Sequence, residues 1–161
     1  MSGMEIERKF LVKDNSYKQL ARSSSYIRQG YICSGHGHTV RVRLRDNQAF
    51  LTIKGPSKDG GLSRYEFEKT ISHDEAEQLF LLCEPGIIDK MRYLVDSGRH
   101  TFEVDEFHGD NDGLVIAEVE LASPDDPYVK PAFLGQEVTG DRRYYNSYLR
   151  SHPYCQWEEK D

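Results

Sequence analysis

Charged side chains occupy alternate positions in several short segments of this chain, and their types point to one kind of chemistry. Arg41, Arg43 and Arg45 follow one another at every second position, and Glu-x-Glu pairs occur in other segments, at 5 and 7, 66 and 68, and 118 and 120. Carboxylate oxygens are the ligands that hard divalent cations prefer, whereas arginine and lysine bind phosphate oxygens through charge-assisted hydrogen bonds. Like charges stand side by side only where a ligand or counter-charge relieves them. The pattern therefore indicates a site for a densely charged anion with metal ions beside it, such as a polyphosphate.

Sixteen charged residues share this alternation, eight acidic and eight basic. A β-strand directs successive side chains to opposite faces, so each segment places its charges on one face and apolar residues on the other. In residues 38–46, for example, the arginines oppose Val40, Val42 and Leu44. The sixteen are Glu5, Glu7, Lys9, Arg41, Arg43, Arg45, Lys54, Arg64, Glu66, Glu68, Lys90, Arg92, Glu103, Asp105, Glu118 and Glu120.

Eight strands and about three helices must position these residues. Short turn-rich pieces separate the strands, which favours antiparallel pairing. Ser72 and Glu75 form a capping-box pattern before an apolar stripe, and Asp141 is a plausible helix cap. The strands are predicted over 4–12, 25–33, 38–46, 49–55, 63–71, 87–95, 100–107 and 114–122. The helices are predicted over 15–22, 72–83 and 141–150, with the tyrosines of 144–148 interpreted as packing residues.

The charged faces distinguish two arrangements of these strands. An open sheet with one face in water also alternates, but such faces mix in Ser, Thr, Asn and Gln. Here the polar faces are almost purely Glu, Arg and Lys, with the signs grouped by strand. Eight strands can close into a barrel that holds one small ligand. We therefore expect a mainly β (α+β) fold, a closed eight-stranded antiparallel barrel with a charged interior, and keep the open, solvated sheet as the alternative.

Length and composition set the remaining limits. The chain has 161 residues, of which 37% are apolar, and this length predicts a single domain over residues 1–161 with a poorly ordered tail from about 153. No apolar run approaches the roughly 18 residues of a membrane helix, and the charged N-terminus does not resemble a signal peptide. Three widely spaced cysteines fit a reducing compartment. We expect a cytoplasmic protein without a membrane partner, and the net charge of −6 argues against nucleic acid.

The ordered series of motifs resembles the CYTH superfamily, also called the triphosphate tunnel metalloenzymes. The resemblance covers residues 4 to about 150 and is greatest to the short, single-domain bacterial members. A lone Glu-x-Glu-x-Lys would carry little weight, but the full series in order is specific. The motifs are Glu5-Ile6-Glu7-Arg8-Lys9, Arg28-Gln29-Gly30-Tyr31, Arg41-x-Arg43, Thr52-Ile53-Lys54-Gly55, Arg64-x-Glu66-x-Glu68, Lys90-x-Arg92-Tyr93, Glu103-Val104-Asp105-x-Phe107, Ala117-Glu118-Val119-Glu120, Gly135-x-Glu137-Val138-Thr139 and Tyr144-x-Asn146.

The resemblance implies a metal-dependent triphosphatase with roles for particular residues. The Mg²⁺ or Mn²⁺ ligands would be Glu5, Glu7, Glu118 and Glu120. A second metal, or the orientation of the basic residues, would fall to Glu66, Glu68, Glu103 and Asp105. The phosphates would be held by Arg41, Arg43, Lys54, Arg64, Lys90 and Arg92, with Arg45 and Arg64 near a tunnel mouth. The catalytic residues would be Lys9, Tyr31, Lys90 and Arg92.

The expected reaction is in-line attack of water on a terminal phosphoryl group, most simply converting inorganic tripolyphosphate to pyrophosphate and phosphate. Tyr31 is one candidate general base and Lys90 is its rival, because neighbouring cations lower the pKa of either group. Thiamine triphosphatase and adenylate cyclase remain alternative activities, and a non-catalytic polyphosphate- or nucleotide-binding module is an alternative of another class. Short relatives of this kind indicate a homodimer.

Overall fold

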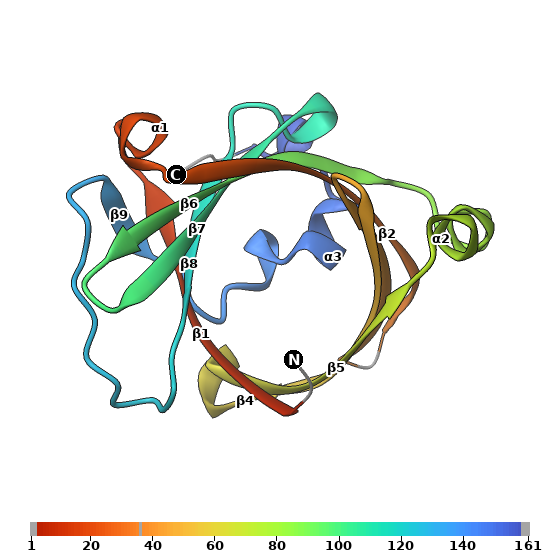
Figure 1. The fold of residues 1–161 in the computed structure, drawn as a ribbon, viewed down its shortest axis with the longest axis horizontal. Helices are drawn as coiled ribbons and strands as arrows, with labels where there is room; N and C mark the ends of the chain where they lie inside the picture. The colour runs from red at the N-terminus through yellow and green to blue at the C-terminus, as the bar shows by residue number, and fades with distance from the viewer. Residues whose placement is uncertain (1–2, 36, 159–161) are drawn as a thin grey trace.

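Eight long strands make up most of the part of the chain that the computed structural model describes, residues 3–35 and 37–158. Each lies where the alternation of charged and apolar residues predicts a strand. Figure 1 looks through the ring that they form. Their bounds are β1 Gly3–Val12, β2 Ser23–Gly35, β3 His38–Arg45, β4 Gln48–Lys58, β5 Ser63–Ile71, β6 Ile88–Ser97, β7 His100–Phe107 and β8 Val115–Glu120.

The strands close into a barrel through β1. The order around the ring is β5-β4-β3-β2-β6-β7-β8-β1, and β1 pairs again with β5. The first residues of β1 pair with β5, as in Glu5 opposite Arg64, and the following residues pair with β8, as in Glu7 opposite Glu120. All of these pairs are antiparallel. The closed barrel is confirmed, and the open sheet is wrong.

A ninth strand, β9 Leu134–Glu137, was not predicted. It lies beside the last residues of β1, where Phe10 pairs with Glu137 and Val12 with Leu134. Four residues of sequence Leu-Gly-Gln-Glu carry no alternating pattern, so only the long-range pairing with β1 defines this strand. Its backbone neighbour Val138 donates to the carbonyl of Lys9 over 2.8 Å, which fixes the segment that leads to the C-terminus.

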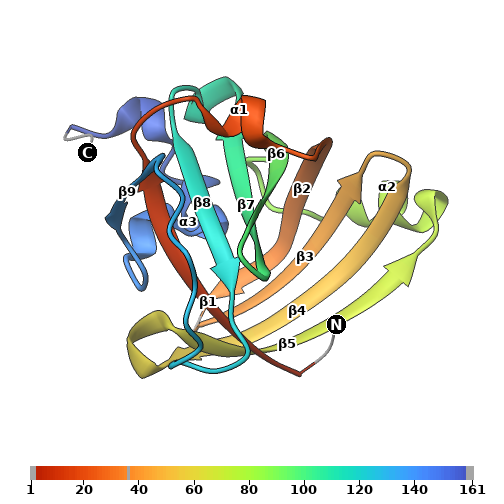
Figure 2. The same cartoon turned by 60° about the vertical axis from the view of Figure 1, so that its left-hand side comes forward.

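Two short helices pack outside the barrel (Figure 2). Helix α1, Tyr17–Leu20, is shorter than the predicted 15–22 because the chain turns extended at Ala21. Helix α2, His73–Phe80, begins with the predicted capping box of Ser72 and Glu75 and covers part of the outer face of β3 and β4. None of the helices in the described residues is long and apolar enough to cross a membrane.

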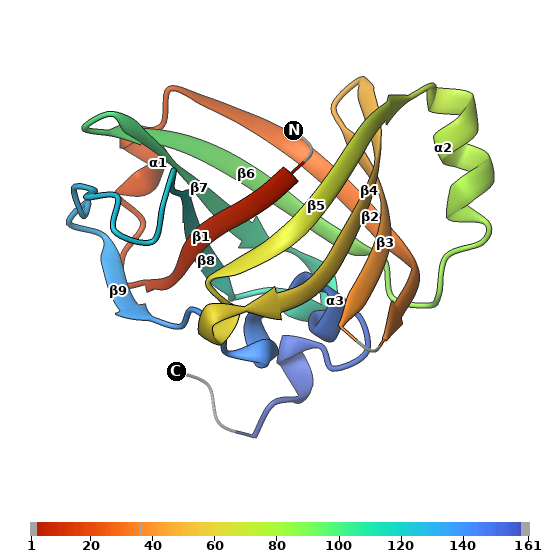
Figure 3. The same cartoon turned by 90° about the horizontal axis from the view of Figure 1, so that it is seen from below.

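The C-terminal helix predicted over 141–150 is wrong as a continuous element. A 3-10 turn at Arg142–Tyr144 and a single helical turn, α3 Asn146–Leu149, are separated at Tyr145, which has extended backbone angles of φ −77° and ψ 136°. This break directs Tyr145 and Asn146 towards the barrel interior. Figure 3 shows α3 at one end of the barrel, and in Figure 1 the same segment crosses the view down the bore.

The chain between residues 153 and 158 makes contacts with the body of the protein, and the order of the tail stays a prediction. Tyr154 and Trp157 pack against a buried cluster that includes Tyr144 and Leu149. The ring of Trp157 contacts those of Tyr144 and Tyr154 with centroid distances of 5.4 and 5.1 Å. Apolar contact of this kind offsets the entropy of ordering the tail. Residues 159–161 lie outside the described residues.

Candidate functional site

A single cavity of about 540 Å³ occupies the barrel interior, and fifteen of the sixteen alternating charges line it. Asp105 is the exception. The cavity runs from a buried end, where Lys90 is 0% exposed, to an exposed end, where the side chain of Arg99 is 68% exposed. The charged interior expected from the sequence is therefore confirmed, and the exposed end of the cavity has a basic residue, Arg99, at which an anion could enter.

The basic wall of the cavity consists of four buried cations on β3 and β6, namely Arg41, Arg43, Lys90 and Arg92. Burial lowers the pKa of Arg43 to about 9, with the charges of Arg41 and Arg92 adding to the shift. Burial also lowers the pKa of Lys90 to about 7, although the charge of Asp105 offsets part of the effect. Both pKa values are lowered first by burial and further by neighbouring positive charge, and a bound anion would oppose both effects.

Asp105 lies behind the basic wall rather than in the cavity. Arg92 donates to both of its oxygens over 2.7 and 2.9 Å, and Lys90 Nζ lies 2.7 Å from Oδ2. Burial raises the pKa of Asp105, but the charges of Arg92 and Lys90 outweigh it and hold the pKa well below its usual range. The carboxylate is thus an ionised counter-charge that fixes two cations.

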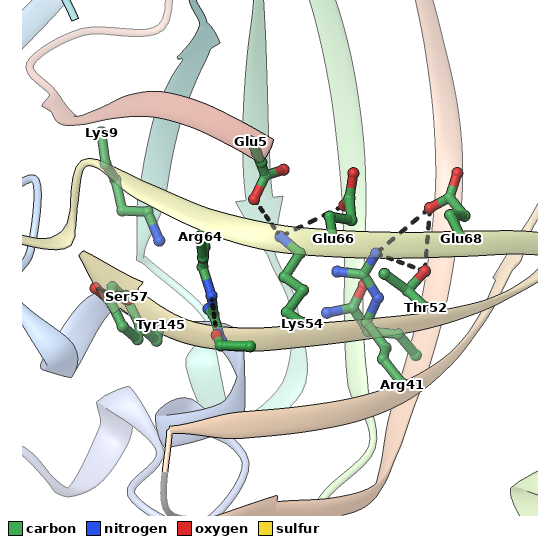
Figure 4. Close-up of polar contacts among 12 residues, drawn as sticks. Glu5, Lys9, Arg41, Thr52, Lys54, Ser57, Arg64, Glu66, Glu68 and Tyr145 are labelled. Carbon is green, nitrogen blue, oxygen red and sulfur yellow. Dashed lines mark hydrogen bonds and ion pairs between the residues drawn. The ribbon is translucent and has the colours of Figure 1, made fainter. Parts of the chain in front are cut away.

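Arg41 is held from one side and leaves a donor unused (Figure 4). Its Nη2 donates to Thr52 Oγ1 over 3.2 Å and lies 3.9 Å from Glu68 Oε2. Thr52 in turn donates to Glu68 over 3.0 Å. The buried Nε of Arg41 has no hydrogen-bond partner among the described residues. An unsatisfied buried donor on a cation fits an anion that binds from the cavity.

The acidic wall consists of Glu5 and Glu7 on β1 with Glu118 and Glu120 on β8. Glu7 stands directly opposite Glu120, and Glu7 donates a hydrogen bond to Glu118. Burial, and then the charge of Glu118, raise the pKa of Glu7 well above its usual value. For Glu118, burial acts in the same direction, but the charge of Lys9 and the bond from Glu7 outweigh it and lower the pKa to about 2. Of these two neighbouring carboxylates, Glu7 therefore binds a proton more readily and Glu118 accepts the hydrogen bond.

The acidic wall fits a divalent cation in its donor chemistry. Hard cations bind carboxylate oxygens, and like-charged carboxylates facing one another are stabilised when a cation lies between them. In residues 3–35 and 37–158, however, no three Asp, Glu, His or Cys side chains already stand in metal-binding geometry. Glu5 is instead held by Lys54, whose Nζ lies 2.8 Å from Glu5 Oε1. Binding a metal would therefore draw these carboxylates together.

Lys54 stands between the acidic and basic sides (Figure 4). Besides Glu5, its Nζ lies 3.8 Å from Glu66 Oε2. Burial lowers the pKa of Lys54, but the charges of Glu7 and Glu5 outweigh it and raise the pKa above its usual value. A cation in this position could exchange a carboxylate for a phosphate oxygen when a metal takes the carboxylate.

The buried end of the cavity contains both predicted and unpredicted residues. Arg64, predicted near a mouth, donates to the carbonyl of Gly55 over 3.0 Å and lies 5.9 Å from the ring of Tyr145. Lys9 Nζ lies 4.8 Å from the same ring. Tyr145 therefore lines the cavity, contrary to its interpretation as a packing residue, whereas Tyr144 is buried in the core. Tyr31 is only 4% exposed and also lines this end.

Sequence reasoning missed two polar side chains at this end, Gln29 and Asn146. Both belong to motifs of the family resemblance, but their own chemistry gave no signal because neutral amides are common on any surface. Gln29 is completely buried and accepts a hydrogen bond from Arg43 Nε over 2.9 Å. Asn146 accepts one from Lys90 Nζ over 2.9 Å. The structure thus adds two uncharged partners to the basic wall.

This chain is similar to known proteins over most of its length. The CYTH domain family model matches residues 3–145. An inorganic triphosphatase from Acetivibrio thermocellus is 46% identical over 158 residues, covering 98% of this chain and 99% of that protein. An inorganic triphosphatase from Nitrosomonas europaea is 36% identical over 152 residues, covering 90% and 95%. A crystal structure of an inorganic triphosphatase matches with a TM-score of 0.61 and 30% identity, covering 91% of this chain and 97% of that one.

Proposed function

The chain belongs to the CYTH domain family, and we propose that it is an inorganic triphosphatase, which hydrolyses tripolyphosphate to pyrophosphate and phosphate with Mg²⁺ or Mn²⁺. One observation carries the proposal: a cavity of about 540 Å³ is lined both by buried cations and by paired carboxylates. The cations fit the phosphate oxygens, and the carboxylates fit a metal ion that shields the charge of those oxygens. The proposed reaction is taken from the two inorganic triphosphatases to which this chain is similar.

The basic wall would bind and orient the triphosphate. Arg41 offers its unused Nε, and Arg43 and Arg92 offer guanidinium groups fixed by buried partners. Fixed cations in a site with little water stabilise the charge that develops on the transferring phosphoryl group without reorganising. Lys54 would bind the phosphates at the border with the acidic wall, and Lys9 and Arg64 at the buried end.

Lys90 is the general base that the geometry favours. Its pKa of about 7 leaves a substantial neutral fraction near neutral pH. A neutral amine has two N–H groups, from which Asp105 and Asn146 can accept hydrogen bonds. It also has a lone pair that can take a proton from water. Tyr31 would then orient the water or share the proton, since its hydroxyl lines the same end of the cavity.

The metal ligands would come from the acidic wall. Glu7, Glu118 and Glu120 would hold Mg²⁺ or Mn²⁺, joined by Glu5 once it releases Lys54, and Glu7 would lose its proton. Such an ion supplies charge neutralisation on phosphate oxygens and polarisation of a bound water. For Glu66, Glu68 and Asp105, contacts with Lys54, Arg41 and Arg92 support a role in positioning cations rather than in a second metal site.

An organic triphosphate is a weaker candidate for the substrate. Aromatic rings that line the cavity are Tyr31, Phe50 and Tyr145, and the last two have cations over their faces: Arg45 lies 5.0 Å from Phe50, and Lys9 lies 4.8 Å from Tyr145. Stacking on thiazole or adenine would have to displace them. Thiamine triphosphatase and adenylate cyclase activities are therefore less well supported than hydrolysis of inorganic triphosphate.

Phosphate release from a panel of substrates tests the proposal. Tripolyphosphate, thiamine triphosphate, ATP and pyrophosphate are each incubated with the protein and Mg²⁺ or Mn²⁺. We expect tripolyphosphate to be the best substrate, pyrophosphate to accumulate, and chelation of the metal to stop the reaction. Absence of phosphate release from every compound, with tripolyphosphate still raising the melting temperature, would contradict the enzyme and indicate a binding module.

A further inference from the structure

Asn146 and Gln29 connect the candidate base to the other groups at the buried end of the cavity. Asn146 Oδ1 accepts hydrogen bonds from Lys90 Nζ over 2.9 Å and from Gln29 Nε2 over 3.1 Å. Gln29 Nε2 also donates to the hydroxyl of Tyr31 over 3.2 Å, and Gln29 Oε1 accepts from Arg43 Nε over 2.9 Å. Two neutral amides thus contact a lysine, an arginine and a tyrosine of the site.

The chemistry of the partners allows one orientation of each amide. Arginine and lysine ammonium groups are donors only. Arg43 therefore requires the oxygen of Gln29, which turns both N–H bonds of that amide towards Tyr31 and Asn146. Asn146 must then present its oxygen, which also suits Lys90. Because Gln29 is 0% exposed, a wrong orientation would leave buried donors or acceptors unsatisfied.

Two hydrogen-bond acceptors next to Lys90 Nζ fix the direction of the third position on that nitrogen. Asp105 Oδ2 lies 2.7 Å from Nζ on one side, and Asn146 Oδ1 lies 2.9 Å away on another. The amine nitrogen carries three substituents besides Cε, whether three protons or two protons and a lone pair. Two directions are thus occupied, and the third is left for the cavity that Lys90 lines. Without Asn146, the contact with Asp105 alone would leave the amino group of Lys90 free to rotate about the Cε–Nζ bond.

Asn146 reaches this position because of the break at Tyr145. The extended residue separates two helical turns and brings Asn146 into the barrel. Lys9 Nζ donates to the carbonyl of Tyr144 over 3.2 Å and lies 4.8 Å from the ring of Tyr145, so the segment is held against β1 at the break. A residue 56 positions away in the sequence is thereby held against Lys90.

We propose that Asn146 is a positioning residue that orients the amino group of Lys90 towards the substrate. Gln29 in turn holds the side chains of Asn146, Arg43 and Tyr31 in place relative to Lys90. The inference rests on the proposed function, since it assigns these amides a role in triphosphate hydrolysis. Asn146 acts on turnover through Lys90, so its removal lowers kcat far more than it raises KM. Asn146→Leu, which has similar volume but no acceptor, is expected to lower kcat by about 10- to 100-fold.

Steady-state kinetics with tripolyphosphate and Mg²⁺ test this expectation. For Asn146→Leu and Gln29→Leu we expect KM within about threefold of the wild type, because most phosphate contacts remain. Asn146→Asp keeps an oxygen for Lys90, so at pH 9 it should retain about tenfold more kcat than Asn146→Leu. Tyr148→Phe, in the same helical turn and outside the cavity lining, is the matched control. Asn146→Ala removes the same oxygen if leucine does not fit.

A double-mutant cycle with Lys90→Met separates positioning from a general structural effect, measured at high enzyme concentration. If Asn146 acts through Lys90, adding Asn146→Leu to Lys90→Met changes kcat by less than about threefold. The same large loss in both backgrounds, or wild-type kcat in Asn146→Leu, would overturn the inference. A wild-type protein that releases no phosphate would instead contradict the proposed function. Melting temperature and tripolyphosphate binding in chelator show that each variant is folded.

Discussion

The basic and acidic walls of the cavity carry opposite charge and are held in place by different means. In the basic wall, each cation has buried partners: Asp105 for Lys90 and Arg92, Gln29 for Arg43, and Thr52 for Arg41. The acidic wall has a hydrogen bond between Glu7 and Glu118 and an ion pair from Glu5 to Lys54. In ring order β8 stands opposite β3, so these parts of the two walls face each other, whereas β6 is separated from β8 only by β7.

This difference indicates an order of assembly. The phosphate-binding side is built into the fold, since its partners are neighbouring strands and the C-terminal segment. The metal-binding side would be completed by a cation, because its carboxylates are now held by a hydrogen bond between Glu7 and Glu118 and by the ion pair of Glu5 with Lys54. Changes in the basic wall should therefore cost stability, and changes in the acidic wall should cost activity while leaving stability unchanged or higher.

Glu7→Gln should separate the effect on activity from the effect on stability most clearly. We expect turnover of tripolyphosphate to be lost by about 10³-fold, because a metal ligand that shields the phosphates is removed. The melting temperature should not fall, since a glutamine amide can donate to Glu118 in place of Glu7 and removes a buried group whose charged form is disfavoured. Phosphate release and thermal unfolding are measured on the same preparation.

Glu77→Gln, on the exposed side of α2, is the control for this change and should behave as the wild type in both measurements. Unchanged activity of Glu7→Gln would remove the acidic wall from the mechanism. A melting temperature lowered by several degrees would show that Glu7 has a structural role.

Asp105→Asn tests the opposite wall. Removing the carboxylate leaves Lys90 and Arg92 without their buried counter-charge, so the free energy of unfolding should fall by about 3–5 kcal/mol. Urea denaturation measures the change, with Asp110→Asn in an exposed turn as control. A loss below about 1 kcal/mol, together with loss of metal binding, would favour the alternative in which Asp105 is a metal ligand.

The pH dependence of stability should report the buried Lys90. Its pKa is lowered to about 7 by burial, against about 10.4 in an unfolded chain. The unfolded state then binds more protons between these values, so the contribution of Lys90 to the free energy of unfolding rises with pH. Between pH 7 and 9 the rise is about 2 kcal/mol. Urea denaturation gives the free energy of unfolding of the wild type and of Lys90→Met at each pH, and the difference between the two isolates the contribution of Lys90. A difference that stays constant or falls with pH would contradict the lowered pKa.

Arg41→Lys should have the smallest effect. Lysine keeps the charge but loses the planar guanidinium and its unused Nε, so KM for tripolyphosphate should rise about tenfold with little change in kcat. Arg142→Lys, on the exposed surface, is the matched control. A fall in kcat without a change in KM would place Arg41 in the chemical step instead of in phosphate binding.

The sequence predicts the barrel and its charged interior well because both depend on a local period of two. Each strand shows which of its residues share a face, and closure follows from eight such strands. The position of Asp105 shows the limit: alternation puts it on the inner face, but two buried cations draw its carboxylate behind the wall. Its expected role as a metal ligand, like the other site roles, stays a prediction.

The C-terminal segment could not be predicted in the same way. Helical spacing of Tyr145, Tyr148 and Leu149 indicated one helix, but Lys9 and Lys90 on distant strands hold the segment in its broken form. Strand β9 likewise exists only through its pairing with β1. Single-domain organisation over 1–161, the cytoplasmic location and the homodimer also stay predictions.

Binding of tripolyphosphate in the presence of a metal chelator tests the central contrast most directly, by calorimetric titration of the wild type and of Glu7→Gln. If the basic wall is built into the fold and the acidic wall needs a cation, both proteins bind tripolyphosphate without metal, both bind more weakly as salt is raised, and Mg²⁺ tightens binding only in the wild type. Failure of the wild type to bind until Mg²⁺ is added would contradict the account.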